Sequence, residues 1–121
     1  MLKILTEHIG NMVIVECDGQ IASAQAARRL GEAVTSEIDA EAVVLDLTEV
    51  DGLTRRVVRM FSFLQRWAKA HDIELKVFGP SESIRDQLRQ ANFEIAGLHE
   101  MIVLLARAKE WQEKYVAAWA A

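Results

Sequence analysis

The chain has 121 residues, of which 51% are hydrophobic and 26% are charged, and its formal net charge is -4. This length suits one hydrophobic core, and a content of six glycines and one proline argues against flexible linkers. The modest acidic charge, with no basic tail or block, gives no support for nucleic acid binding. We therefore expect residues 1–121 to form a single domain.

The pattern of cysteine, histidine and glycine excludes several kinds of site. Cys17 is the only cysteine, which rules out an internal disulfide, and no Cys or His cluster has zinc spacing. We expect Cys17 to be a small buried hydrophobe, and we expect neither a metal nor a cofactor, since the isolated glycines match no nucleotide-binding fingerprint. Glu7, His8 and Asn11 interrupt the first apolar stretch, and no apolar run approaches the roughly 18 residues of a membrane span. These features predict a cytoplasmic protein without direct membrane insertion.

Hydrophobic periodicity predicts an alternation of strands and helices along the chain. Two strands over 2–8 and 12–17 are separated by Gly10-Asn11, a hairpin signal. The remaining elements, in order, are a helix over about 22–37, a strand over 42–48, a helix over 54–71, a strand over 74–78, a helix over 82–91, a weak strand over 93–96 and a long helix over about 99–119. Turn signals at Asp18-Gly19 and Asp51-Gly52 end the second and third strands. This order predicts an α/β fold with a mixed sheet of four to five strands and crossover helices.

The segment from Ala42 to Phe63 joins a strand that is apolar on both faces to a helix that begins near Thr54. In α/β proteins, the carboxyl end of a central strand is a common place for a functional site. Arg55 and Arg56 put positive charge in the first helical turn, where the helix dipole favours acidic side chains. The hydroxyl of Thr54 is expected to cap the amino end of this helix.

The helix at 54–71 divides into two faces at 100° per residue. Its apolar side comprises Val57, Met60, Phe61, Leu64, Ala68 and His71, and its basic side comprises Arg55, Arg59, Ser62, Arg66 and Lys69. The basic side contains no acidic residue, so it is either a solvated outer surface or a cationic surface for a partner. Arg56 and Phe63 flank it, and Phe63 either contributes to a partner surface or packs under the adjacent helix.

Three segments resemble the STAS domain of bacterial anti-sigma factor antagonists: Gly19-Gln20-Ile21, the sequence VVLDLTEVD at 43–51, and the sequence FGPSESIRDQLRQANF at 78–93. The resemblance spans nearly the whole chain and implies a STAS-like fold. In that family the strand leads to a D-S-S-G loop, and a partner anti-sigma factor kinase phosphorylates the first serine of the loop. Here the four positions are occupied by Thr54, Arg55, Arg56 and Val57, so Arg55 replaces the switch serine.

The resemblance implies a non-enzymatic regulatory module that binds a protein partner. Because arginine carries the charge opposite to phosphate, we expect no phosphorylation switch at that position, although Thr54 remains an alternative, displaced phosphoacceptor. The implied partner is an anti-sigma factor or kinase-like ATPase, and the alternative is the ATPase of an ABC lipid transporter, with this chain as its accessory subunit. The expected partner-binding residues are Asp51, Gly52, Thr54, Arg55, Arg56, Arg59, Phe63 and Arg66.

Asp46 and Asp51, two carboxylates near the junction, have no histidine close in sequence, so no general acid and base pair is predicted. Trp111, Tyr115 and Trp119 recur at helical spacing in the last helix, which is longer than one small sheet requires. They either fold back on the domain or form an oligomer contact, such as a homodimer.

Overall fold

The structure is a computed structural model that describes residues 2–120, with the side chains of residues 111–120 excepted. Its elements, in chain order, are β1 (Lys3–Ile9), β2 (Met12–Ile21), α1 (Ala24–Thr35), β3 (Ala42–Leu53), α2 (Arg55–Ala70), β4 (Glu74–Phe78), α3 (Glu82–Gln90), β5 (Ile95–Ala96) and α4 (Leu98–Ala120). The strands form one sheet in the order β1-β2-β3-β4-β5. Only β1 pairs antiparallel with its neighbour, so the predicted α/β fold with a mixed sheet is confirmed.

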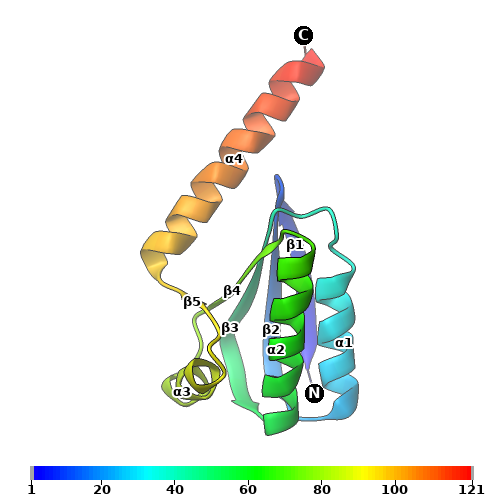
Figure 1. Cartoon of the computed structure of the whole chain (residues 1–121). Coiled ribbons are helices and arrows are strands. Elements are labelled where there is room, and N and C mark those ends of the chain that lie inside the picture. Colours follow the sequence, from blue (N-terminus) through cyan, green and yellow to red (C-terminus); the bar gives the residue numbers. More distant parts are fainter. Residues whose placement is uncertain (1, 121) are drawn as a thin grey trace.

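Helices α1, α2 and α3 cover one face of the sheet (Figure 1). Because side chains alternate along a strand, Val43, Leu45 and Leu47 of β3 all point into this layer and are fully buried. Phe61 of α2 is also fully buried, and its ring lies 5.8 Å from the ring of Phe93. This main core fixes α2 against the sheet and leaves its opposite side in solvent.

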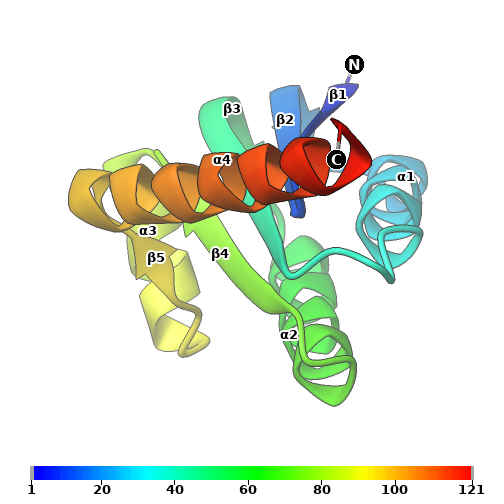
Figure 2. The ribbon, with the colours of Figure 1, turned by 90° about the horizontal axis from the view of Figure 1, so that it is seen from above.

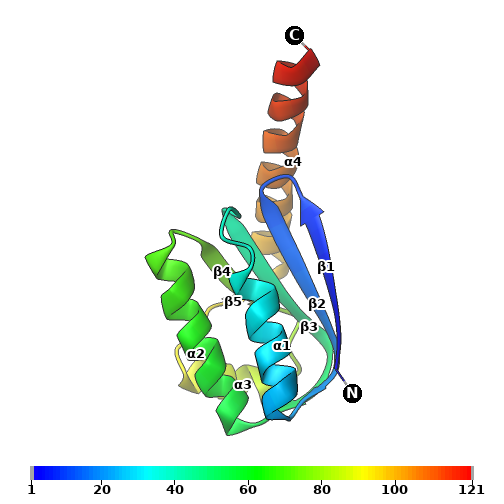
Figure 3. The same cartoon turned by 90° about the vertical axis from the view of Figure 1, so that its right-hand side faces the viewer.

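Helix α4 covers part of the other face of the sheet (Figures 2 and 3). Met101, Leu104 and Ala108 of α4 pack with Met12 of β2 and Val44 of β3 in a second, smaller core. Beyond this contact, α4 continues past the sheet (Figure 1). None of the helices in the described part of the chain combines the length and the apolarity that a membrane crossing requires.

The second and third strands are longer than the sequence pattern predicts. The prediction of turns at Asp18-Gly19 and Asp51-Gly52 is wrong, because these residues continue β2 and β3, respectively. The two extensions pair with each other, with Gln20 opposite Gly52, and register shifts interrupt the ladder nearby. Gly19 has φ of 114°, which only glycine adopts readily, beside one of these shifts. Pairing between distant segments therefore overrides the local turn signals.

Local signals predict the other boundaries well. Gly10 adopts φ of 58° in the turn between β1 and β2, as the hairpin signal requires. Helix α1 begins at Ala24 because Ser23 is its N-cap, accepting a hydrogen bond from the backbone N–H of Ala26 at 3.0 Å, and it ends at Thr35, so it is shorter than the predicted 22–37. The long last helix is present, with α4 running from Leu98 to Ala120.

Candidate functional site

The junction between β3 and α2 is built around a capped helix start. Thr54 has extended backbone geometry, and its Oγ1 accepts a hydrogen bond from the backbone N–H of Val57 at 3.4 Å. The Thr54 carbonyl also accepts from the N–H groups of Val57 and Val58, each at 3.1 Å. The expected N-cap is therefore confirmed. It makes Arg55 the first residue of α2, and this turn contains no acidic side chain.

The outer side of α2 forms the basic face, which we define as Arg55, Arg59, Arg66 and Lys69. All four side chains are exposed, whereas Val57, Phe61, Leu64 and Ala68 on the opposite side are buried. Met60 is half-buried and His71 is exposed as the C-cap, so the predicted apolar side is narrower than expected. Among the described residues, no ion pair involves any member of the basic face. These cations are therefore available to a partner.

The other predicted site residues lie around this helix start. Arg56 is exposed in the first turn of α2. Asp51 is exposed and Gly52 is half-buried, but both belong to the end of β3 and not to a turn. Neither residue lines the groove between α2 and α3. The structure therefore brings together only part of the predicted set of partner-binding residues.

A groove between α2 and α3 adds residues that the sequence did not single out. Its volume is about 390 Å³, and it is lined by Arg55, Val58, Arg59, Gln87, Gln90 and Ala91. Ser81 caps α3, and the burial of Ile84 and Leu88 turns Gln87 and Gln90 towards α2. The weak signal for this wall was the pair of glutamines one turn apart, which flank the apolar side of α3.

Phe63 does not pack under the adjacent helix. Its side chain is 53% exposed at the edge of a groove of about 310 Å³ between α1 and α2. The two helices approach closely here, and Met60 reaches Gly31 of α1. This exposure excludes the role of Phe63 in packing under the adjacent helix. Its other expected role, as part of a partner surface, stays a prediction.

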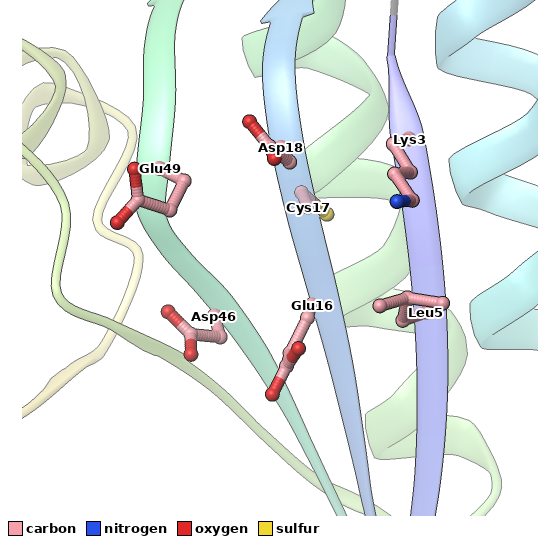
Figure 4. A pocket seen from close by; sticks show the side chains of 7 residues that line it. All are labelled: Lys3, Leu5, Glu16, Cys17, Asp18, Asp46 and Glu49. Carbon is pink, nitrogen blue, oxygen red and sulfur yellow. The ribbon is translucent and has the colours of Figure 1, made fainter.

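The part of the second sheet face that α4 leaves open is acidic (Figure 4). A small cavity of about 130 Å³ is lined by Lys3, Leu5, Glu16, Cys17, Asp18, Asp46 and Glu49. Asp46 accepts hydrogen bonds at one oxygen from the backbone N–H and the hydroxyl of Thr48, at 3.0 and 2.6 Å. Within the described residues, no group of His, Cys, Asp and Glu side chains could hold a metal ion.

Cys17 belongs to the main core, as predicted. Burial, with a smaller contribution from the nearby Asp46 carboxylate, raises the pKa of the Cys17 thiol to about 12. A thiol with such a high pKa is a poor nucleophile at neutral pH. Cys17 therefore contributes packing and not chemistry.

Ion pairs connect α4 to the sheet. The ammonium of Lys76 lies 3.0 Å from Glu94 and 3.2 Å from Glu100, and Arg107 lies 3.0 Å from Glu74. Burial acts to lower the pKa of Lys76, but its hydrogen bonds to Glu94 and Glu100 outweigh burial and raise the pKa above its usual value. Lys76 is thus a charged link between β4, the loop before β5, and α4.

The aromatic residues predicted to form an oligomer contact, Trp111, Tyr115 and Trp119, lie outside the described side chains. The earlier part of α4 exposes Leu98 and Ile102 on the side away from the sheet. The homodimer therefore stays a prediction.

The mixed sheet, the helices on both faces and a capped helix start after the central strand together define a STAS-type domain. The sequence profile of the STAS domain matches residues 3–111. Because this match covers well over half of the 121 residues, the chain belongs to the STAS-domain family. No curated protein matches the sequence.

Several solved structures share the fold. An anti-sigma factor antagonist from Mycobacterium paratuberculosis is 17% identical and superposes with a TM-score of 0.72, covering 88% of this chain and 95% of that one. An RsbS variant from Moorella thermoacetica is 13% identical, with a TM-score of 0.70 and coverage of 87% and 96%. The anti-sigma factor antagonist SpoIIAA in its unphosphorylated form is 11% identical, with a TM-score of 0.67 and coverage of 88% and 98%. At these identities the likeness is one of fold alone.

Proposed function

We propose that this chain is a non-enzymatic regulatory module that binds a protein partner through the start and the basic face of α2. The observation that carries the proposal is that Arg55 and Arg59, directly after the Thr54 cap, form no ion pair with any residue that the structure describes. Arginine is enriched among residues that dominate binding energy, and an unpaired guanidinium can form two hydrogen bonds with a carboxylate. The module acts in the cytoplasm, where an unpaired cysteine persists as a thiol.

We infer that this binding is not controlled by phosphorylation at the usual serine position. SpoIIAA, which shares the fold, has been solved in an unphosphorylated and a phosphorylated form. Arg55 offers no hydroxyl there, and its charge is opposite to that of a phosphate. The nearby Thr54 hydroxyl accepts the capping hydrogen bond from the backbone N–H of Val57. A partner of the anti-sigma factor or kinase-like ATPase class would therefore bind constitutively.

The same lack of a switch supports a second candidate, an accessory subunit that binds the ATPase of an ABC lipid transporter. An assembly subunit has no need of a phosphorylation-dependent release. The two candidates use the same face of α2 and differ in the partner. Titration of the purified chain with a kinase-like anti-sigma factor and with an ABC ATPase from the same genome separates them, since only one should bind.

Charge reversal tests the proposed surface. The double variant Arg55→Glu with Arg59→Glu should weaken binding to the partner by at least about tenfold, because it replaces both attractive charges with repulsive ones. The matched control is Arg85→Glu with Lys109→Glu, which makes the same change in net charge at exposed positions on α3 and α4. Equal affinities for the two double variants would remove the basis for the proposed surface.

A further inference from the structure

We propose that the groove between α2 and α3 binds an acidic amphipathic helix of the protein partner. The helix would place an apolar side chain on Val58 and Ala91, between carboxylates that contact Arg55 and Arg59. This inference rests on the proposed function and extends the interaction surface to α3, which so far has only a structural role. It also specifies the chemistry by which the partner is recognised.

The two walls of the groove present hydrogen-bond donors. Arg55 and Arg59 stand one turn apart on α2, and Gln87 and Gln90 stand one turn apart on α3. None of the described residues that line the groove is acidic. The amino end of α2 also lies here, and its dipole adds positive potential. The walls therefore favour carboxylates that repeat at one-turn spacing, as they do along one side of a helix.

The floor of the groove is apolar. Val58 and Ala91 are half-buried between the two walls. An apolar centre surrounded by polar donors is the arrangement found at protein interfaces, where the centre excludes water and the rim provides orientation. The volume of about 390 Å³ provides room for partner side chains, and residues of both α2 and α3 line the groove. A helix with one apolar stripe between acidic residues matches this layout.

The charge distribution favours an acidic protein segment over other anionic partners. Among the described residues, Arg55 and Arg59 form no ion pair, whereas Lys76 and Arg107 each have carboxylate partners. The whole chain carries a net charge of -4, which opposes broad adhesion to nucleic acid or to an anionic membrane. Two guanidinium groups beside an apolar floor instead suit a local contact that becomes strong when water is excluded.

The direct test uses the full chain and a synthetic helical peptide in which each leucine is flanked by glutamates three and four residues away. We expect saturable shifts of the backbone amide NMR signals of Val58, Gln87, Gln90 and Ala91 as the peptide is added. A control peptide with glutamine in place of glutamate should bind at least about tenfold more weakly, because the charged contacts are lost. Absence of shifts, or shifts confined to another surface, would overturn the inference.

The variant Gln87→Glu with Gln90→Glu adds two carboxylates opposite Arg55 and Arg59 and should weaken peptide binding by at least about tenfold. Glutamate is as good a helix former as glutamine, so α3 should remain folded, and the amide spectrum of the free variant verifies this. Inorganic phosphate and vesicles of phosphatidylglycerol serve as alternative probes. Shifts of the same amides with either of these, but not with the peptide, would also overturn the inference.

Partner binding separates this inference from the proposed function. If Arg55→Glu with Arg59→Glu abolishes partner binding while Gln87→Glu with Gln90→Glu leaves it unchanged, the basic face stands and the groove is excluded. If neither variant changes partner binding, both proposals fail. Loss of binding in both variants supports the groove.

Discussion

Replacing Thr54 with alanine removes the hydroxyl that caps α2 and tests how the candidate site is built. The loss of a serine or threonine N-cap costs about 0.5–2 kcal/mol, typically about 1 kcal/mol. The donor–acceptor distance between Val57 N and Thr54 Oγ1 is 3.4 Å, longer than the 3.0 Å between Ala26 N and Ser23 Oγ in α1. We therefore expect Thr54→Ala to lower the free energy of unfolding by about 0.5–1 kcal/mol, and Ser23→Ala to lower it by about 1–1.5 kcal/mol.

Urea unfolding followed by far-ultraviolet circular dichroism measures both variants, and the melting temperature of Thr54→Ala should fall by about 2–4 °C. Thr54→Asp provides a further comparison, because aspartate also caps a helix and interacts favourably with the dipole. It should keep the stability of the natural chain, while its charge beside Arg55 weakens binding to an acidic partner. A Thr54→Ala variant as stable as the natural chain would refute the capping role of the hydroxyl.

Three further predictions concern stability and reactivity. Gly79 has φ of 70°, and a Cβ there would collide with a neighbouring side chain. Gly79→Ala should therefore lower the free energy of unfolding, measured in urea, by about 2 kcal/mol or more. The control Gly52→Ala should lower it much less, because a Cβ at Gly52 meets nothing within 4 Å. The Lys76 side chain is 13% exposed, and Lys76→Met should lower the free energy of unfolding by about 1–2 kcal/mol at neutral pH. Because the folded state raises the pKa of Lys76, the stabilisation by its ion pairs is complete below its unfolded pKa near 10.4 and is lost as the pH rises through the folded pKa. The difference in the free energy of unfolding between Lys76→Met and the natural chain should therefore become smaller in alkali. Cys17 should resist a thiol reagent at about pH 8 in the folded chain and react at once in urea, and rapid labelling of the native chain would contradict its burial.

The junction after β3 could be predicted because it depends on local patterns. The helical spacing of Val57, Phe61 and Leu64 identifies the buried side of α2, and the structure buries all three. The threonine before this pattern identifies the helix start, and the structure places Thr54 at the N-cap. Both features depend on residues within one helix, so no knowledge of the tertiary fold was needed.

Features that depend on distant segments were missed or misjudged. Asp51-Gly52 looks like a turn, but the extended end of β2 pairs with it, as the opposition of Gln20 and Gly52 shows. The wall of the groove formed by Gln87 and Gln90 depends on how α3 packs beside α2, and the exposure of Phe63 depends on the approach of α1. Spacing along one helix cannot supply such information, because it is set by the packing of separate elements.

The uncovered acidic area of the sheet was also absent from the sequence prediction. Glu16 and Asp46 lie side by side on neighbouring strands although they are far apart in the sequence, and Asp18 lies beside Glu49 in the same way. Their register becomes known only when β2 and β3 are paired. The alternation of buried and exposed side chains within each strand was a local signal, but it did not indicate which acidic residues would be neighbours.

The central claim is that this STAS domain binds its partner without a phosphorylation switch. The most direct measurement is to incubate the chain with the cognate kinase and ATP, determine its intact mass, and then titrate it with the partner. We predict an unchanged mass and an unchanged affinity. A gain of about 80 Da that peptide fragmentation places on Thr54, accompanied by a loss of partner binding, would contradict the claim, because it would restore the phosphate-controlled charge that Arg55 is proposed to exclude.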